Sequence, residues 1–464
     1  MLKIRARSYK PVSVNETGPS ELVALNEGTT LQMLQATYWI EQRKSSGADP
    51  SAVLWNSEAI QYFNYTNRKM LGIGNVLFDF EEIGDVYAGK SVLTLINELI
   101  DSFKGFQGFY VNDEYAEQAY FDQLIENTGK SRVPELVTPR YGIAVRREAL
   151  QRLPSEDMLQ TKNGTLYYDR MANTELLPFE PVVVLWSSAD ETYSLVVCRS
   201  CGGWVKSDAI AYCRDKQEWL DAQDPERFLT VTGKELHLTV DPYTPQLSGM
   251  TLPMGTRLAL VPLEEQPSQL HGRSTFGCYV ASVPTLADDG SLTYTLQPIP
   301  VTEDVHIGYL EFTEENVLTQ AFKHLGALYG WAGANNAQDC SGYAKEVYAC
   351  FGITLPRTSA AQIRMQSVKT YDLRFASAEH KLALLKKAPA GSILYLPGHI
   401  MLYTGMVSGE PYVISSVGSI VSESTPEGCE IQTNQVALTS LLQTLRSDRS
   451  TWLDSVTAMV VMEQ

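Results

Sequence analysis

The side chains with the clearest capacity for chemistry are a cysteine and a histidine that stand 59 residues apart. Cys340 lies within the string Asp339-Cys340-Ser341-Gly342-Tyr343, and His399 follows Pro397-Gly398. A thiol attacks as its thiolate, and an imidazole can take up the proton and later return it to a leaving amine. The pair therefore predicts nucleophilic attack on an amide, with Cys340 as the nucleophile and His399 as the base.

The predicted elements place both side chains at the start of a regular segment. A helix is expected to begin at Cys340, because apolar residues recur after it at spacings of three and four and Gly352 can end it. Its N-terminus would stabilise a thiolate, and N–H groups near Cys340 and Ser341 would stabilise an oxyanion. Asp339 stands at the N-cap position. A strand is expected to begin at His399, so that the preceding turn fixes the direction of the imidazole.

Changes in pattern along the chain predict a multidomain α+β fold. Helical periodicity dominates the N-terminal part, short apolar strands with turn signals about every 8–12 residues follow, and a helix leading into strands forms the last part. We expect four parts: a mainly helical N-terminal region at 1–134, small β-barrels at 135–222 and 223–308, and a C-terminal α+β domain at 309–464.

Charge and composition narrow the classes of partner and location. The 464 residues carry a net charge of −17, which disfavours nucleic acid and suits a substrate with a free amine. No apolar run approaches the roughly 18 residues of a membrane span. The start, Met1–Ser8, has basic residues without a following apolar region, so no secretory signal is expected. We therefore expect a cytoplasmic protein, or one of the cell envelope or exterior if a signal was removed.

The seven cysteines do not form the pattern of a disulfide framework. Cys340 and Cys350 would be about 15 Å apart on one helix, too far to bridge. Cys198 and Cys201 form a C-x-x-C sequence with Cys213 nearby, but no fourth ligand stands at a usual zinc spacing. We therefore predict neither a metal site nor another cofactor.

The C-terminal part, from about residue 313 to residue 464, resembles the NlpC/P60 family of papain-like cysteine peptidases. The upstream part resembles the multidomain branch of that family, in which an N-terminal stabilising region and two bacterial SH3-like barrels precede the peptidase. Gly203-Trp204-Val205 is similar to the closing motif of such a barrel, and Val305–Leu310 to the junction into the peptidase. The matching C-terminal strings are Tyr329–Gly333, Asp339–Tyr343, Phe351–Ser359 with Gln362, and Gly398–Tyr403.

The resemblance implies hydrolysis of the γ-D-glutamyl–L-diamino-acid bond in the stem peptides of peptidoglycan. Cys340 would be the nucleophile and His399 the base. In relatives with a barrel beside the cleft, the substrate carries a free N-terminal L-Ala. The residues of this chain that would bind its ammonium are Asp339, Ser341 and the barrel residue Tyr168. Trp331, in the glycine-rich string, is expected to contact the substrate. Asp339 would otherwise be a plain helix cap, Ser341 ordinary first-turn sequence, and Tyr168 barrel core.

One departure from the family concerns the residue that orients the catalytic histidine. The family usually has a second histidine there, whereas alignment of the strand Tyr412-Val413-Ile414 gives Ser415. A serine still accepts a hydrogen bond from imidazole but holds it less firmly, and the intact Asp339-Cys340-Ser341 and His399 make an active peptidase the leading hypothesis. A weakened or silent protein that binds murein peptides, and a related thiol amidase or acyltransferase, remain as alternatives. Neither the identity of the diamino acid nor an oligomeric state is predicted.

Overall fold

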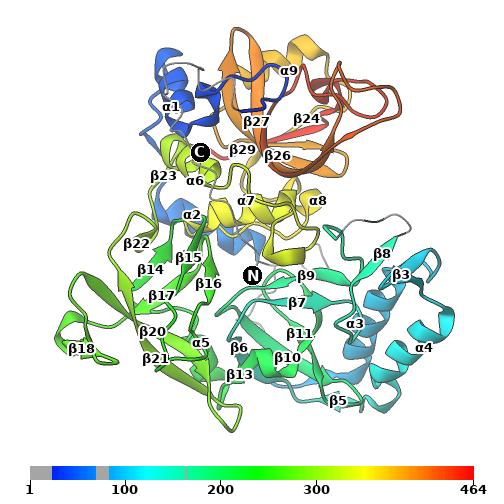
Figure 1. Cartoon of the computed structure of the whole chain (residues 1–464), viewed down its shortest axis with the longest axis vertical. Helices are drawn as coiled ribbons and strands as arrows, with labels where there is room; N and C mark the ends of the chain where they lie inside the picture. Colours follow the sequence, from blue (N-terminus) through cyan, green and yellow to red (C-terminus); the bar gives the residue numbers. More distant parts are fainter. Residues whose placement is uncertain (1–22, 69–82, 162–163, 165, 464) are drawn as a thin grey trace, which may run out of the picture.

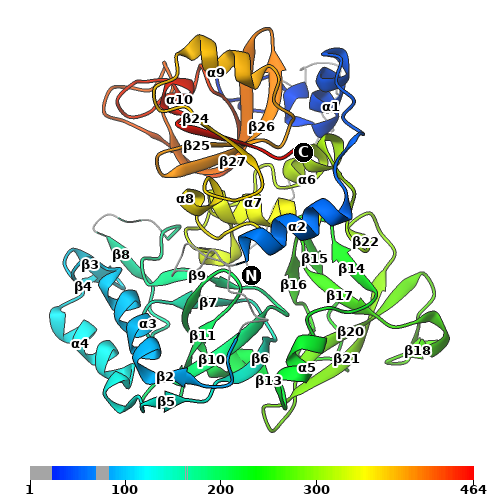
Figure 2. The ribbon, with the colours of Figure 1, turned by 180° about the vertical axis from the view of Figure 1, so that it is seen from behind.

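The structure is a computed structural model that describes residues 23–68, 83–161, 164 and 166–463. Met1–Ser8, the segment examined for a secretory signal, lies outside these residues. Two sheet-containing bodies lie side by side and a third lies across them, as Figure 1 and, from behind, Figure 2 show. Within the described ranges, no helix combines the length and apolar content that crossing a bilayer requires.

The N-terminal helices are shared between two of these bodies. Trp39 is fully buried, and its ring lies 5.2 Å from that of Tyr412 in the C-terminal body. Ile96, farther along, shares instead the core of the first sheet with Trp204. The helices are α1 (Ala36–Ser45) and α2 (Ser57–Asn67), which pack on the C-terminal body, and α3 (Gly89–Asp101) and α4 (Gln118–Asn127), which pack on the first sheet body.

The first sheet body lies within the range predicted for the first barrel, and its neighbouring strands pair antiparallel. Trp204, from the predicted closing motif, is fully buried at its centre. That this sheet is SH3-like, and that it ends at residue 222, remain proposals. The strand order is β13 (Ile210–Tyr212), β6 (Arg140–Ala144), β10 (Pro181–Ser187), β11 (Tyr193–Val197), β12 (Gly202–Lys206), β7 (Glu148–Gln151) and β9 (Ala172–Leu176).

The second sheet body falls within the range predicted for the second barrel, and its SH3-like character likewise remains a proposal. Its core is formed by residues such as Leu229, Val283 and Ile299, all of them fully buried. The strand order is β21 (Leu292–Pro300), β20 (Cys278–Leu286), β17 (Arg257–Leu260), β14 (Phe228–Val231) and β22 (Val305–Ile307), with the separate pairs β15 (Glu235–His237) with β16 (Thr251–Pro253) and β18 (Gln269–Leu270) with β19 (Arg273–Ser274).

The C-terminal body is an antiparallel sheet with helices packed on it, which confirms the predicted α+β class. Thr313 caps its first helix by accepting the Asn316 N–H at 3.1 Å, and that helix ends at Lys323. The helices are α6 (Glu314–Lys323), α7 (Cys340–Ala349), α8 (Ser359–Gln362), α9 (Ala378–Leu385) and α10 (Trp452–Ser455). The strand order is β24 (Lys369–Asp372), β29 (Ala458–Val461), β25 (Ile393–Leu396), β26 (His399–Val407), β27 (Glu410–Ile420) and β28 (Ile431–Ser440).

Shorter elements complete the fold. The pair of β1 with β23 joins the N-terminal segment to the start of the C-terminal body. These elements are β1 (Val53–Trp55), β2 (Tyr87–Ala88), β3 (Phe109–Val111), β4 (Glu114–Tyr115), β5 (Leu136–Val137), β8 (Leu159–Thr161), β23 (Phe312–Thr313), α5 (Lys216–Asp221) and the 3₁₀ turns Gln32–Leu34, Lys130–Arg132, Ser207–Ala209, Leu263–Glu265 and Ala334–Asn336.

Candidate active site

Cys340 is the first residue of α7, as predicted. Asp339 caps the helix, because its Oδ1 accepts a hydrogen bond from the Gly342 N–H at 2.8 Å. The opposite face of α7 is buried in the core that it shares with β26 and β27. The backbone N–H of Ile400 lies against the Cys340 sulfur. The helix start is thereby held beside the start of β26, where His399 stands.

The direction of the His399 ring is fixed from two sides. β25 and β26 form a hairpin through Pro397 and Gly398, and Gly398 has φ of 89°, a conformation that glycine adopts at little cost. His399 Nε2 lies 3.0 Å from Ser415 Oγ in the neighbouring β27. The Trp452 ring packs against the imidazole at an interplanar angle of 61°, with 5.4 Å between the ring centroids. The residue aligned with the family's third position is therefore in hydrogen-bond contact with the histidine.

Cys340 and His399 line the same cavity, whose volume is ≈ 410 Å³. Asp339, Ser341, Tyr168 and Trp331 line it as well, so each of these predicted substrate-binding residues is at or next to the cysteine and histidine. Ser415 stands behind the imidazole and is fully buried. The wall of the cavity thus combines α7, the C-terminal sheet and a segment of the first sheet body.

Tyr168 is half-buried in this wall, so the alternative that placed it in a barrel core is wrong. Its ring lies 5.3 Å from that of Tyr329 and 6.0 Å from that of Trp331. The backbone continues the contact, since the Trp331 N–H donates to the Tyr167 carbonyl at 2.8 Å. A Cβ added at Gly418 would lie 1.9 Å from the Tyr168 hydroxyl oxygen, so a side chain there would displace the tyrosine.

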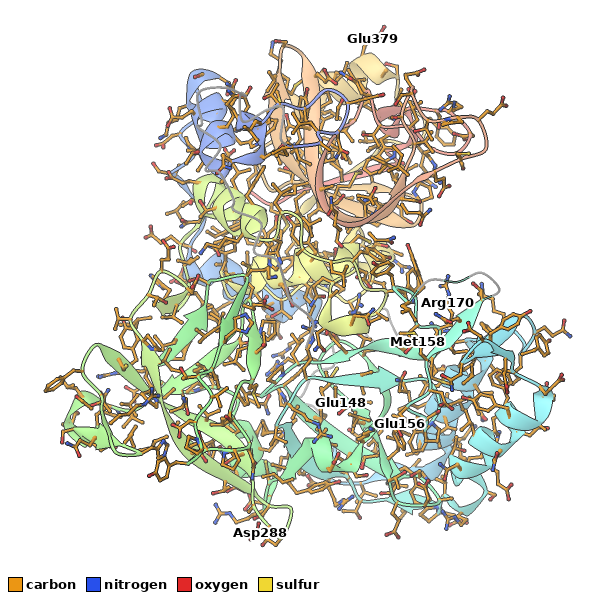
Figure 3. The ribbon with its side chains drawn as sticks, viewed as in Figure 1. Glu148, Glu156, Met158, Arg170, Asp288 and Glu379 are labelled. Atoms are coloured by element: carbon orange, nitrogen blue, oxygen red, sulfur yellow. The ribbon has the colours of Figure 1, made fainter. Side chains whose placement is uncertain are left out.

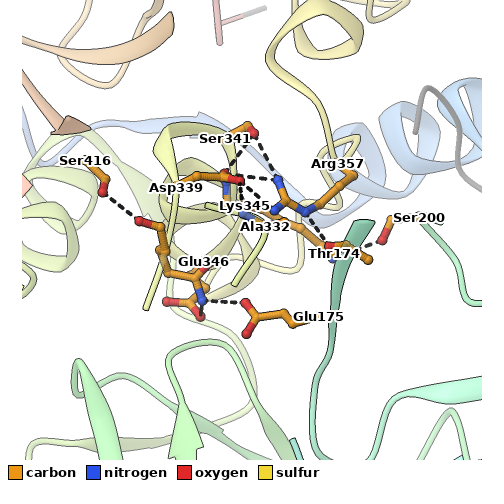
Figure 4. Close-up of polar contacts among 12 residues, drawn as sticks. Thr174, Glu175, Ser200, Ala332, Asp339, Ser341, Lys345, Glu346, Arg357 and Ser416 are labelled. Carbon is orange, nitrogen blue, oxygen red and sulfur yellow. Dashed lines mark hydrogen bonds and ion pairs between the residues drawn. The ribbon is translucent and has the colours of Figure 1, made fainter. Parts of the chain in front are cut away.

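The charged residue beside the cysteine has a buried partner that holds it in place. Arg357 donates to both oxygens of Asp339, at 3.0 and 2.7 Å, and to Ser341 Oγ at 3.1 Å. Ser341 Oγ in turn donates to Asp339 at 3.1 Å, and the Ala332 N–H does so at 3.1 Å. Arg357 also bonds Thr174 of β9 (Figure 4). Asp339 and Ser341 therefore belong to a network that joins the C-terminal body to the first sheet.

A second buried network lies behind the first. Gln338, the residue before Asp339, donates through its side chain to Glu175 of β9 at 2.8 Å and to Glu346 of α7. Its carbonyl accepts from Ser416 Oγ of β27 at 2.7 Å (Figure 4). The loop that leads into Cys340 is thus anchored to the first sheet, to α7 and to the C-terminal sheet.

The protonation states of the pair differ from the expected thiolate. Burial, reinforced by the charge of Asp339, raises the pKa of the Cys340 thiol to about 12, and outweighs the nearby N–H groups. Burial, with a contribution from Arg446, lowers the pKa of His399 to about 4. Burial also opposes ionisation of Asp339, but Arg357 outweighs it and holds that pKa below its usual range. At neutral pH the site therefore pairs a thiol with a neutral imidazole, which is free to act as a base.

Sequence reasoning missed two contributors to this site. Arg357 stood inside a matched string, Leu355-Pro356-Arg357, but nothing local identified Asp339 as its partner. Trp452 lies 53 residues beyond His399, and no pattern in the sequence connected the two. Both contacts arise from the tertiary fold.

The C-x-x-C sequence lies in the first sheet body. Cys198 and Cys201 are both fully buried and outside any disulfide, and the side chain of Asn173 donates to Cys201 Sγ at 3.0 Å. In the part of the chain that the structure describes, no group of three or more His, Cys, Asp and Glu side chains is arranged to hold a metal ion.

Comparison with known proteins agrees with this geometry. A sequence model described as the NlpC/P60 family matches residues 326–439, which include Cys340, His399 and Ser415. A stretch of 47 residues is 53% identical to the probable endopeptidase p60 of Listeria monocytogenes and 51% identical to that of Listeria seeligeri. These stretches cover 10% of this chain and 10% and 9% of the two relatives, so the chain matches only about a tenth of their length.

The fold of nearly the whole chain has a solved counterpart. The structure of an NlpC/P60 endopeptidase from Photobacterium damselae subsp. piscicida superposes with a TM-score of 0.71, over 92% of this chain and 96% of the other. The sequence identity is 16%, so this likeness concerns the fold alone. The cysteine and the histidine therefore lie in an NlpC/P60 family domain, at residues 326–439 of this chain, and the first sheet body completes the wall of their cavity.

Proposed function

We propose that this protein is a cysteine endopeptidase that hydrolyses the γ-D-glutamyl–L-diamino-acid bond of peptidoglycan stem peptides with a free N-terminal L-Ala. The observation that carries the proposal is the shared cavity of Cys340 and His399, with His399 Nε2 3.0 Å from Ser415 Oγ. The NlpC/P60 match over the same residues and its p60 endopeptidase relatives support action on a peptidoglycan peptide.

The first half of the reaction would form a thioester. His399 Nδ1 takes the proton of the Cys340 thiol as the sulfur attacks the γ-carbonyl carbon, and Nε2–H donates to Ser415 Oγ. This order suits a site in which the thiol and the imidazole are both neutral at rest. Negative charge that develops on the carbonyl oxygen is stabilised by N–H groups at the start of α7. Collapse of the tetrahedral intermediate breaks the C–N bond, and His399 returns the proton to the leaving amine of the diamino acid.

The second half would regenerate the enzyme. A water molecule gives a proton to His399 and attacks the thioester carbonyl, the C–S bond breaks, and the sulfur recovers the proton. The products are L-Ala-D-Glu and the peptide that begins with the diamino acid. Trp452, through its ring contact, and Ser415, through its hydrogen bond to Nε2, would keep the imidazole in one orientation through both halves.

The free amine of L-Ala would be received by Asp339, Ser341 and Tyr168, which line one cavity. Arg357 keeps Asp339 ionised although it is buried, and the ammonium would share the carboxylate oxygens with the donors of Arg357, Ser341, Gly342 and Ala332. Tyr168 supplies a hydroxyl from the first sheet body and Trp331 a wall beside it. A peptide extended beyond L-Ala would lack this ammonium and should therefore be a poorer substrate.

A panel of defined peptides tests the proposal. L-Ala-γ-D-Glu-L-diamino-acid peptides, with the diamino acid as meso-diaminopimelate or lysine, are incubated with the protein and the products are identified by mass spectrometry. Release of L-Ala-D-Glu supports the proposal, and N-acetylation of L-Ala should lower kcat/KM by about 10-fold or more through loss of a charge-assisted hydrogen bond. Binding of the intact peptide without cleavage would indicate the silent binding protein instead, and cleavage of other amides alone would indicate an amidase.

A further inference from the structure

The catalytic cavity contains an arginine that the reaction outlined above does not use. Arg152 follows β7, where its backbone N–H donates to the Met171 carbonyl at 2.9 Å, and its side chain lines the cavity together with Cys340 and His399. Its Nε is buried without a hydrogen-bond partner. Among the residues that the structure describes, no side chain forms a hydrogen bond or ion pair with the guanidinium, and the aromatic ring of Phe103 lies 5.5 Å from its Cζ.

The charges around Arg152 compensate it only in part. The nearby acid Asp169 is buried, and its Oδ1 accepts from the backbone N–H groups of Leu159 and Met171 at 3.0 and 2.8 Å. Burial lowers the pKa of Arg152, the like charge of Arg170 adds to this effect, and Asp169 acts in the opposite direction. Arg170 lies at the edge of the first sheet body that faces the C-terminal body (Figure 3), with its Cζ 4.9 Å from the Trp331 ring.

The other charges of the cavity cancel. Asp339 and Arg357 form a buried pair, and the thiol and imidazole are neutral at pH 7. The cavity therefore has an excess of positive charge from Arg152, although the whole chain carries −17. A buried cation without a partner is unfavourable, so this side chain favours a ligand that brings an anion into the cavity.

We propose that Arg152 binds the free α-carboxylate of the D-glutamyl residue and so selects acidic stem peptides over those whose α-carboxylate is amidated. This inference rests on the proposed function. The α-carboxylate is present on every non-amidated substrate, only a few bonds from the γ-carbonyl carbon that Cys340 would attack.

The place of Arg152 in the fold favours this group over the carboxylates of the leaving peptide. Arg152 and Tyr168 both come from the first sheet body, and Tyr168 is assigned to the N-terminal L-Ala on the acyl side of the scissile bond. A guanidinium matches a carboxylate with two parallel N–H···O bonds. An α-amide has only one acceptor oxygen for the two N–H donors of the guanidinium, since its NH₂ group is itself a donor. The amide also brings no negative charge, so it should bind Arg152 less well than the carboxylate. The neighbouring Asn173 cannot substitute, since its side chain donates to Cys201 and to the Gly202 carbonyl.

Two peptides that differ in one group test the inference. L-Ala-γ-D-Glu-L-diamino-acid and its α-amide are compared by kcat/KM for the wild-type protein and for Arg152→Gln, Arg152→Lys and Arg146→Gln. Arg146 is the matched control, because it lies in the same body and is paired with Glu148 and Asp208 away from the cavity. Circular dichroism confirms that each variant is folded.

The wild-type protein should prefer the carboxylate peptide by about 10- to 100-fold, the value of a charge-assisted hydrogen bond. Arg152→Gln should remove this preference, because it should lose activity on the carboxylate peptide alone. Arg152→Lys should retain part of the preference, and Arg146→Gln should retain all of it. Equal wild-type rates on the two peptides would overturn the inference and leave the proposed function intact. An equal loss on both peptides in Arg152→Gln would overturn it too, because that is the result of a packing role. Cleavage of neither peptide by the wild type would overturn the proposed function itself.

Discussion

Replacing Arg357 by Met should strongly destabilise the protein. The change removes both hydrogen bonds to Asp339, at 3.0 and 2.7 Å, and leaves the carboxylate buried with only the Ala332 and Gly342 N–H groups and the Ser341 hydroxyl as donors. Removing one member of a buried ion pair costs about 3–5 kcal/mol. Loss of the bond from the charged guanidinium to the Thr174 hydroxyl adds roughly 1.5 kcal/mol. We therefore expect the free energy of unfolding to fall by about 4.5–6.5 kcal/mol, the sum of these two values.

The double variant Asp339→Asn/Arg357→Met separates charge from packing. Asparagine still caps a helix, so this pair keeps the cap of α7 and removes the buried charge. Each single variant leaves one ion unpaired, whereas the double variant leaves none. The double variant should therefore be more stable than the sum of the single losses predicts, by at least about 2 kcal/mol.

Equilibrium urea denaturation, followed by tryptophan fluorescence and circular dichroism, measures these differences. The control is Arg374→Met, whose ion pair with Asp372 is exposed, and it should leave the urea midpoint unchanged. An unchanged midpoint in Arg357→Met, or strictly additive losses in the double variant, would refute the view that Asp339 needs its partner.

Three further predictions concern catalysis. Ser415→Ala removes one neutral hydrogen bond to His399 and should lower kcat/KM by about 2- to 10-fold. An unchanged kcat/KM would show that Ser415 does not orient the ring. Burial and Arg446 lower the pKa of His399 to about 4, so the acid limb of the pH profile of kcat/KM should lie well below pH 6.5. Arg446→Gln should shift this limb to higher pH. A limb near pH 6.5 in both the wild type and Arg446→Gln would contradict this prediction. Tyr168→Phe should raise KM for free-amine peptides by about 2- to 10-fold with little effect on N-acetylated ones, and an equal effect on both would exclude contact with the amine.

The same histidine makes a prediction about stability. The pKa of His399 in the folded protein is about 4, below the value of about 6.5 in an unfolded chain. Between these two values the unfolded chain binds more protons, so stability rises with pH there and is lost as the pH falls from about 6.5 to about 4. A titration of the urea midpoint over this range should show a smaller loss in His399→Gln than in wild type, and equal losses would show that another group is responsible.

The sequence was informative where the chemistry is local. Cys340 begins a helix because a capping aspartate precedes it and an apolar stripe follows, and both signals lie within one short segment. His399 begins a strand because Pro397 and Gly398 form the turn before it. Ser415 could be aligned because the two strands of a hairpin are close in sequence, and its side chain does reach the imidazole.

The contacts that the sequence did not reveal join distant segments. Arg357 pairs with Asp339 and Thr174, and the second of these comes from another sheet body, 183 residues away. The division of the N-terminal helices between two bodies also escaped prediction, because amphipathic helices reveal which face is buried but not which partner covers it. The resting thiol of Cys340 likewise depends on burial, which opposes the helix N-terminus that alone would favour a thiolate.

The most direct test of the account is to compare product release by the wild-type protein, Cys340→Ala and His399→Ala on L-Ala-γ-D-Glu-L-diamino-acid peptides. Each variant is first shown to be folded by circular dichroism, and L-Ala-D-Glu is then quantified by mass spectrometry. We predict release by the wild type, none by Cys340→Ala and a residual trace by His399→Ala. Undiminished release by folded Cys340→Ala would contradict the account, because the bond would then be broken without the thiol.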